Sequence, residues 1–266
     1  MGGIKERVRG RPGGTWGARL RWAAAVLLAG LLPCVQAQEV EPVDSMAWRV
    51  KACSACHGDR GRATPEGYFP RLAGKPADYL FRQMQNFRDG RRNHTQMRYL
   101  MAHLSDDYLR EIAGYFAQRE VPYSPPLGAQ ASAPVLAQGR ALVLQGDAAR
   151  GLPACVACHG PAMTGVLPAV PGLLGLSRDY LNSQLGAWRT GARRAQSPDC
   201  MSEIARKLSV HEVGAISAWL AAQPVPLGGA PLGGKPLAQQ PAPAPMACAG
   251  LEAAPPAAGA TAREKP

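Results

Sequence analysis

The chain contains one cysteine motif twice, and this repeat constrains its fold and chemistry more than any other feature. The heptapeptide ACSACHG at 52–58 returns as ACVACHG at 154–160. In each copy two cysteines stand three positions apart, and a histidine follows the second cysteine. Three kinds of site contain cysteines at this spacing: half of a zinc site, a redox-active dithiol and a haem attachment point.

The similarity between the two halves extends well beyond the motif. Cys53, Cys56 and His57 correspond to Cys155, Cys158 and His159 at an offset of 102 residues. At offsets of 101 to 104 the further matches are Pro70 with Pro171, Gly74 with Gly175, Asp78-Tyr79-Leu80 with Asp179-Tyr180-Leu181, Gln83 with Gln184, Gly90 with Gly191, and Leu104-Ser105 with Leu208-Ser209. The offset between matched residues changes by only three over this length, which indicates two homologous domains in tandem.

Residues 1–37 have the composition of a secretory signal peptide. A basic head is followed by the apolar run AAAVLLAGLL at 23–32, and small residues typical of a cleavage site end at Ala37. A run of ten apolar residues is too short to cross the hydrocarbon core of a bilayer as an anchor. We therefore expect cleavage after Ala37 and export to the periplasm.

Composition predicts the remaining boundaries. The first domain is expected at 38–122 and the second at 135–225, and a linker rich in Pro, Ala and Ser joins them at 123–134. Residues 226–266 are rich in Pro, Ala and Gly and poor in large apolar residues. Such a composition cannot bury a core, so we expect a mostly disordered tail.

Both domains are predicted to be helical. Apolar residues recur at helical spacing in five segments: 78–90, 105–120, 136–145, 179–191 and 209–223. Ser105 is expected to cap its helix, and Ser209 with Glu212 forms a capping-box pattern. No segment alternates convincingly as a strand. The predicted fold class is therefore all-α, with three to four short helices in each domain.

The charge of the chain favours a protein partner over a nucleic acid. Removal of the leader, with its six basic residues and one acidic residue, lowers the formal net charge from +11 to +6. No basic cluster interleaved with aromatic residues is present, as nucleic-acid binding would require. A mild excess spread over two domains suits docking on an acidic protein patch, so we expect redox protein partners and no nucleic acid.

Haem attachment explains the duplicated motif better than the alternatives. A structural zinc site needs a second ligand pair about 12–20 residues away, whereas the next cysteine pair here lies in the other domain. A thioredoxin-like dithiol needs a βαβ setting, and neither alternative explains the histidine. Cysteines at i and i+3 lie about one helical turn apart, so each can form a thioether with one haem vinyl group. The following histidine, His57 or His159, then becomes an iron ligand.

A second iron ligand in each domain is expected to be methionine, whose soft thioether favours ferrous iron. Register selects Met97 and Met201, because each lies seven residues before a matched Leu-Ser pair. The other methionines considered are Met84, which aligns with Leu185, Met101, which aligns with Ala205, and Met163, which has no counterpart. His94 and His103 have no partner in the second domain and are expected at the solvated surface.

Pro70 and Pro171 follow the two histidines by 13 and 12 residues. Proline has a carbonyl group but no N–H, so a loop fixed there could accept a hydrogen bond from the histidine Nδ1–H. Such a bond would lock the tautomer and raise the basicity of the ligand. A simple turn role for both prolines stays open.

The combination of motifs resembles the c4-type dihaem cytochromes c. The resemblance rests on CHG, PRLAGKPADYL, FRDGRR, LSDD and AGYFA, and it covers residues 46–224. It implies two tandem class I cytochrome c domains, each folded around one covalently bound haem c. The implied iron ligands are His57 with Met97, and His159 with Met201. The second domain departs in PGLLGLSRDYL, which is less typical than its counterpart.

The resemblance implies electron transport in the periplasm. A quinol-oxidising complex would be the donor and a terminal oxidase the acceptor, and membrane contact would come only through such partners. The alternative is an electron-accepting haem subunit of a dehydrogenase, such as a flavocytochrome that oxidises sulfide. A dihaem peroxidase needs one haem that can lose its sixth ligand, and a matched methionine in both domains counts against it.

Two cysteines lie outside the motifs in the mature chain. Cys200 stands beside the proposed ligand Met201, and Cys248 lies in the tail. In an oxidising compartment such cysteines usually pair. A disulfide between them is a hypothesis that the sequence leaves open.

Overall fold

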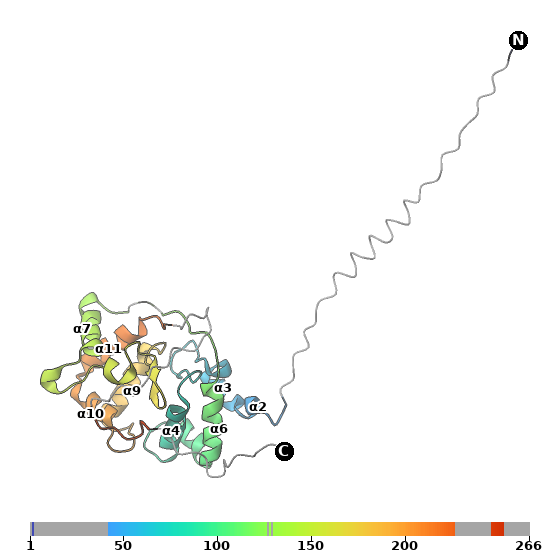
Figure 1. Cartoon of the computed structure of the whole chain (residues 1–266), viewed down its shortest axis with the longest axis horizontal. Coiled ribbons are helices and arrows are strands. Elements are labelled where there is room, and N and C mark those ends of the chain that lie inside the picture. The colour runs from blue at the N-terminus through green and yellow to red at the C-terminus, as the bar shows by residue number, and fades with distance from the viewer. Residues whose placement is uncertain (1, 3–41, 127, 129, 227–245, 253–266) are drawn as a thin grey trace. The chain divides into compact units, whose positions relative to one another are not determined.

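The computed structural model describes Gly2 and residues 42–126, 128, 130–226 and 246–252 (Figure 1). The predicted signal peptide lies outside the described residues, apart from Gly2, and so does most of the predicted tail. The chain divides into residues 1–41 and 42–266, and all of the described helices and strands belong to the second unit.

The first domain folds into short helices. They are α2 (Met46–Arg49), α3 (Lys51–His57), the 3-10 helix η1 (Asp59–Gly61), α4 (Ala77–Arg88), α5 (Thr95–Met101) and α6 (Asp106–Ala117). As predicted, Ser105 is the N-cap of α6, and its side chain accepts a hydrogen bond from the Tyr108 backbone N–H at 3.3 Å.

The core of the first domain lies between α4 and α6, which pack side by side (Figure 1). Helix α4 contributes Leu80 and Phe87, and α6 contributes Leu109, Ile112 and Phe116, all of them buried. Burial of each such side chain contributes about 1.5–3 kcal/mol. This packing supports one wall of the cavity that the two cysteine motifs line.

The second domain repeats this plan. Its elements are α7 (Ala133–Leu144), the 3-10 helix η2 (Ala148–Arg150), α8 (Val156–His159), β1 (Gly165–Val166), β2 (Val170–Pro171), α9 (Arg178–Thr190), α10 (Cys200–Lys207) and α11 (Val210–Ala221). Strands β1 and β2 pair antiparallel. The all-α fold class is confirmed, and these strands of two residues each are too short to produce an alternating pattern in the sequence.

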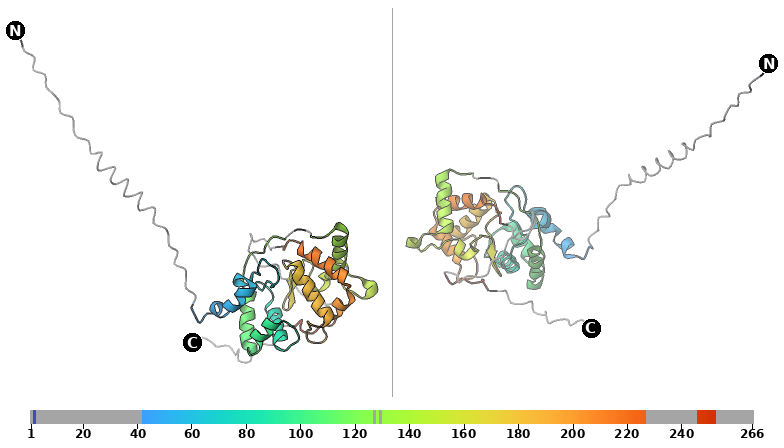
Figure 2. Two further views of the ribbon diagram at one scale, coloured as in Figure 1. Left: turned by 180° about the vertical axis from the view of Figure 1, so that it is seen from behind. Right: turned by 45° about the horizontal axis from the view of Figure 1, so that its top comes forward.

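Helix α7 crosses α11 at very short range, and the two helices lie side by side in both views of Figure 2. Gly139 makes the approach possible, since a Cβ atom at this position would lie 2.1 Å from the backbone oxygen of Ala215. Val143 from α7 and Ile216 and Leu220 from α11 are buried around the crossing. A glycine in a helix, normally unfavourable, here allows the core to close.

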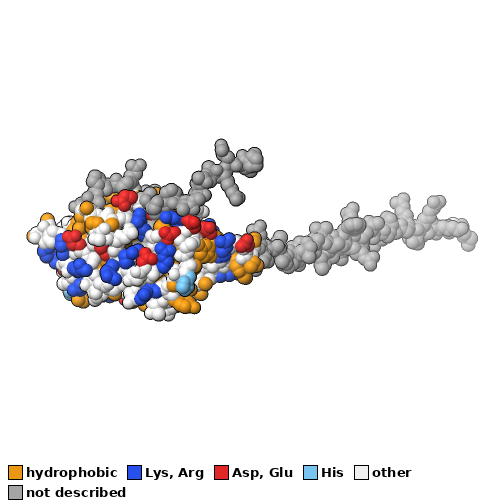
Figure 3. All heavy atoms as spheres, turned by 90° about the horizontal axis from the view of Figure 1, so that it is seen from below, with side chains coloured by type: hydrophobic (Ala, Val, Ile, Leu, Met, Phe, Trp, Pro, Cys, Tyr) orange, Lys and Arg blue, Asp and Glu red, His pale blue; other side chains and the backbone are white. Residues whose placement is uncertain are grey.

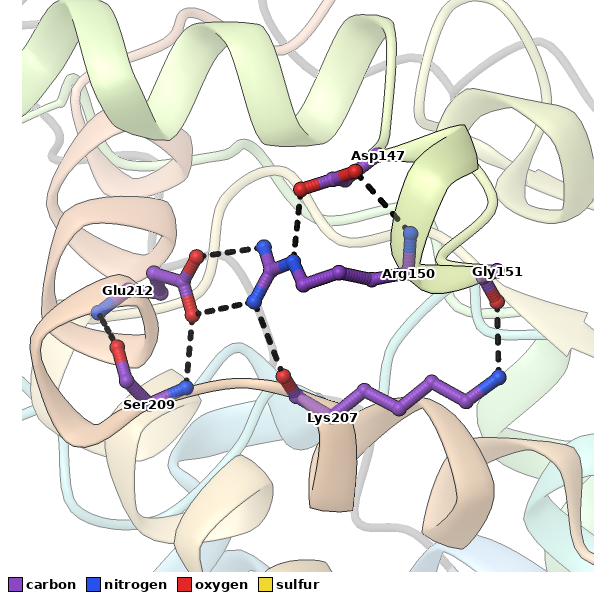
Figure 4. Close-up of polar contacts among 6 residues, drawn as sticks. All are labelled: Asp147, Arg150, Gly151, Lys207, Ser209 and Glu212. Carbon is purple, nitrogen blue, oxygen red and sulfur yellow. Dashed lines mark hydrogen bonds and ion pairs between the residues drawn. The ribbon is translucent and has the colours of Figure 1, made fainter.

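A polar network fixes the start of α11 (Figure 4). Ser209 and Glu212 form the predicted capping box. The Glu212 carboxylate also accepts from the Arg150 guanidinium at 2.7 Å, and Arg150 pairs with Asp147 at 2.7 Å. These bonds join the η2 turn to α11, and they hold the pKa of Glu212 near 2, well below its usual range, chiefly through the hydrogen bond from Arg150.

The surface charge is mixed. Figure 3 shows Lys and Arg spread across one face with Asp and Glu between them. In the part of the chain that the structure describes, no helix has the length and apolar character needed to span a bilayer.

Candidate haem sites

The two cysteine motifs occupy equivalent helix ends. His57 is the last residue of α3 and His159 is the last residue of α8. In both cases the next residue is a glycine with positive φ, 76° at Gly58 and 82° at Gly160. A Cβ on Gly58 would lie 2.3 Å from the Ala63 backbone oxygen. The glycine after each histidine is therefore required for the chain to turn sharply away from the motif.

Each motif histidine is buried and oriented by a proline carbonyl. The Nδ1–H of His57 donates to the Pro70 oxygen at 2.9 Å, and that of His159 donates to the Pro171 oxygen at 2.8 Å. A carbonyl can only accept, so the proton resides on Nδ1 and the Nε2 lone pair is left for a metal. The predicted hydrogen bonds are confirmed. Burial also lowers the pKa of both imidazoles, which favours the neutral form that binds iron.

The four motif cysteines carry free thiols. Burial raises the pKa of Cys53, and it raises the pKa of Cys155 to about 11. A redox dithiol requires a lowered thiol pKa, so this environment does not suit thiol–disulfide chemistry. Among the described residues no group of three His, Cys, Asp or Glu side chains is arranged to hold a metal ion. The zinc alternative therefore finds no support in the arrangement of side chains.

A single cavity of about 580 Å³ reaches both motifs. All four motif cysteines and both motif histidines line it, together with the proposed ligands Met97 and Met201. Met97 is the third residue of α5 and Met201 is the second residue of α10. The structure thus brings together every residue that the sequence assigned to the two sites.

The structure also places the other methionines and histidines that were considered as iron ligands. Met84 and Met101 also line the cavity, but both are buried in the core of the first domain. Met163 is buried elsewhere in the second domain, and His103 is exposed as expected. His94 is different: it is half-buried and lines the cavity, so the expected surface position is wrong. His94 is the N-cap residue of α5, and its ring lies 6.5 Å from that of Phe87.

Two buried arginines meet where the domains join. Arg92 and Arg193 are 8% and 4% exposed, and their backbones form an antiparallel bridge. Arg92 donates to the side-chain oxygens of Gln83 and Gln184 at 3.0 and 2.7 Å, and Arg193 donates to the same two oxygens at 2.8 Å. Arg92 also donates to the Tyr180 hydroxyl at 3.0 Å. These acceptors are neutral, and burial lowers the pKa of Arg193, with the nearby charge of Arg92 as a further cause.

A third buried cation reaches from the first domain into the second. The Lys75 ammonium donates to the Gly172 carbonyl at 2.8 Å. Burial lowers the pKa of Lys75 to about 7, and the charge of Arg71 acts in the same direction. Desolvated cations beside neutral acceptors are costly unless an anion lies near them.

These features fit haem groups, each of which carries two propionate carboxylates. Arg92, Arg193 and Lys75 line the cavity and would offset the propionate charge. Two buried nitrogens in the cavity wall, His94 Nδ1 and Trp188 Nε1, lack a hydrogen-bond partner within the described structure. The arginine pair was not predicted from the sequence, although Arg92 and Arg193 stand at the repeat offset of 101, two residues after the matched Gly90 and Gly191.

Known proteins similar to this chain are named as cytochromes or as electron acceptors. Over 181 residues it is 38% identical to cytochrome c4 of Pseudomonas aeruginosa, which covers 66% of this chain and 87% of that protein. It is 37% identical over 177 residues to the thiosulfate dehydrogenase electron acceptor of Thiomonas intermedia, which covers 65% of this chain and 79% of that one. No protein-family model matches the chain.

Two solved structures are also similar. The reduced cytochrome c4 of Pseudomonas stutzeri aligns with a TM-score of 0.56 and 33% identity over 66% of this chain and 95% of that one. The thiosulfate dehydrogenase of Marichromatium purpuratum aligns with a TM-score of 0.56 and 35% identity over 65% of this chain. The match covers only 36% of that larger protein.

Proposed function

Because the chain belongs to the cytochrome c4 family, and is thus a dihaem electron-transfer protein rather than an enzyme, we propose that it carries electrons through the periplasm from a quinol-oxidising complex toward a terminal oxidase. Two covalently attached haem c groups are its cofactors. The observation that supports the proposal most strongly is the duplicated site, in which each motif histidine is held by a proline carbonyl inside a shared cavity.

The proposed ligand set follows the repeat. Cys53 and Cys56 would attach one haem, and Cys155 and Cys158 the other. His57 with Met97, and His159 with Met201, would bind the two irons. When bound, each haem supplies reversible one-electron exchange between ferric and ferrous iron. The protein residues orient the imidazoles, exclude water through the apolar cavity wall, and place cations where the propionates would lie.

The proposed periplasmic location rests on the composition of residues 1–37, with cleavage after Ala37. The mature chain would then comprise domains at 38–122 and 135–225. Tyr123, at the start of the proposed linker, packs under the Arg71 guanidinium at 3.8 Å, and α7 begins at Ala133.

Exposed side chains near Met97 suggest where a partner docks. Tyr99 and Leu100 lie on α5, and Tyr68 lies in the loop between η1 and α4; Tyr68 and Leu100 also line the cavity. Tyr99 is 82% exposed. Apolar side chains at the mouth of a cofactor cavity suit a short-lived electron-transfer contact, so we propose that partners approach the first haem here.

A second candidate function is acceptance of electrons from a dehydrogenase. From the sequence alone, the example expected is a sulfide-oxidising flavocytochrome. The names of the relatives instead favour an enzyme that oxidises thiosulfate, because proteins from Thiomonas intermedia and Stutzerimonas stutzeri, 37% and 36% identical, are named thiosulfate dehydrogenase electron acceptors.

Stopped-flow kinetics with purified partners from the host test both candidates. The oxidised protein is mixed with a quinol-oxidising complex and quinol, or with thiosulfate dehydrogenase and thiosulfate. The reduced protein is mixed with the terminal oxidase. Fast reduction by the quinol complex and fast oxidation by the oxidase support the carrier proposal, and fast reduction by thiosulfate dehydrogenase alone supports the second candidate. Tyr99→Ser should slow the favoured reaction, whereas Val210→Ser, an exposed position on α11, should not.

A further inference from the structure

The segment 246–252, which belongs to the predicted tail, lines the shared cavity and is bonded to the residue before Met201, and we name it the strap. We propose that the strap, tethered by a Cys200–Cys248 disulfide, closes this cavity beside Met201 and positions the Met201 side chain. The proposal rests on the ligand role of Met201 proposed above. It goes beyond that role because it assigns a function to a segment outside both cytochrome domains.

The tether acts next to the proposed ligand. Cys200 and Cys248 are joined by a disulfide, with their Cα atoms 5.5 Å apart and a sequence separation of 48. Cys200 is the first residue of α10 and Met201 is the second. The disulfide therefore restrains the turn of α10 from which the methionine side chain projects.

Two further contacts hold the strap in place. The backbone N–H of Ala249 donates to the Pro198 carbonyl at 3.0 Å, just before α10. From the first domain, the Arg82 guanidinium on α4 donates to the Glu252 carbonyl at 2.8 Å. The strap is thus attached to both domains: the disulfide and Ala249 join it to the second domain, and Glu252 joins it to the first.

The strap forms part of the cavity wall. Cys248, Ala249, Gly250 and Leu251 all line the cavity that Met201 also lines. Leu251 is half-buried there. For an external ligand to reach the iron on this side, Met201 must leave and the strap must move. A strap that keeps the open state rare lowers the apparent affinity for such a ligand in proportion.

The first domain provides an internal comparison. By the register that matches Met97 with Met201, Gln96 takes the place of Cys200. Gln96 is exposed, and the residues that follow Met97 include the exposed Tyr99. The two sites therefore share histidine, proline and methionine positions but differ in this tether. A protein in which the strap covers one haem and leaves the other accessible exchanges electrons with its partners at the accessible haem.

Imidazole binding to the oxidised, full-length mature protein tests the proposal. Imidazole displaces methionine from ferric haem, and loss of the weak sulfur-to-iron absorption band in the far red reports this displacement. Proton NMR resolves the bound methionine methyl groups of the two haems, which Met97→Ala and Met201→Ala assign. In the wild type we expect the first haem to bind imidazole more tightly than the second.

Two variants separate the effect of the strap residues on the cavity from the effect of the disulfide. Truncation after Cys248 keeps the disulfide and removes most of the strap, whereas the double variant Cys200→Ser with Cys248→Ser removes the tether. Each should raise the imidazole affinity of the second haem by about tenfold and leave the first haem unchanged. Gln96→Ser is the matched control and should change neither haem.

Unchanged affinity at the second haem in the truncated protein would overturn the proposal, as would an equal rise at both haems. If the double variant fails to mature, the truncated protein, which retains every cysteine, still gives the answer. A wrong assignment of Met201 as iron ligand would give a different result from a wrong strap proposal. The spectrum of the wild type would then lack a methionine band for the second haem before any change to the strap.

Discussion

Arg92 and Arg193 are equivalent residues of the two domains, and each donates to the side-chain oxygens of both Gln83 and Gln184. Their neighbours add backbone bonds, from Asn93 N–H to the Ala192 oxygen and from Arg194 N–H to the Arg91 oxygen. These bonds are 2.9 and 2.7 Å long. The junction therefore has approximate two-fold symmetry, with two buried positive charges at its centre.

This arrangement predicts the effect of Arg193→Gln on the redox potentials. A buried positive charge near a haem favours the reduced state, which is less positive by one charge, so its removal should lower the potentials. We expect a fall of roughly 30–60 mV, about 1 kcal/mol at 59 mV per tenfold change. Spectroelectrochemical titration measures it. The exposed neighbour Arg194 provides the control, since Arg194→Gln should shift the potentials far less.

The proposed methionine ligands predict a selective spectroscopic loss. Met97→Ala and Met201→Ala should each abolish about half of the methionine-to-iron absorption band and lower one of the two potentials, because a soft thioether stabilises ferrous iron. Met101→Leu is the decisive control, since Met101 lines the same cavity but belongs to the core. A band that survives Met97→Ala and disappears in Met101→Leu would reassign the first ligand to Met101.

The crossing of α7 and α11 predicts opposite effects for two glycine substitutions. Gly139→Ala would place a methyl group against the Ala215 backbone and should destabilise the protein by about 2 kcal/mol or more. Gly214→Ala on α11 meets no atom within 4 Å and should stabilise by about 0.5–1 kcal/mol. Guanidinium unfolding followed by circular dichroism compares them. Equal effects would mean that the helices do not approach this closely.

The Glu212–Arg150 pair predicts how stability changes in acid. The pKa of Glu212 is lowered from 4.5 to about 2 in the folded protein, so its contribution is complete above pH 4.5 and is lost as the pH falls toward 2. After allowance for solvent screening, Glu212→Gln should cost about 1–2 kcal/mol at neutral pH. The deficit relative to wild type should shrink below pH 4. A deficit that stays constant from pH 7 to pH 2 would contradict the ion pair.

Much of the site could be predicted because its chemistry depends on short-range spacing. Two cysteines and a histidine within five residues define an attachment motif, and the repeat register places Pro70, Met97 and their counterparts without knowledge of the fold. The cap at Ser105 and the capping box at Ser209 are also local, because each depends on residues three positions apart.

The features that could not be predicted depend on contacts between distant segments or on very short elements. Helices α5 and α10 have seven and eight residues, too few to give a clear helical period, although they carry Met97 and Met201. Arg92 is buried in contact with Tyr180 and Gln184 of the second domain, about 90 residues away in sequence. The composition of the tail predicted disorder, and only the hypothesis of a Cys200–Cys248 disulfide, which the structure contains, pointed to contact between the tail and the second domain.

The most direct test of the central claim is the haem content of the mature protein. Intact mass spectrometry of the denatured chain, combined with the alkaline pyridine haemochrome spectrum, counts covalently attached haem. We predict two haem groups per chain, both retained after acid–acetone extraction. A chain that carries one haem or none, or that releases its haem to the solvent, would contradict the claim.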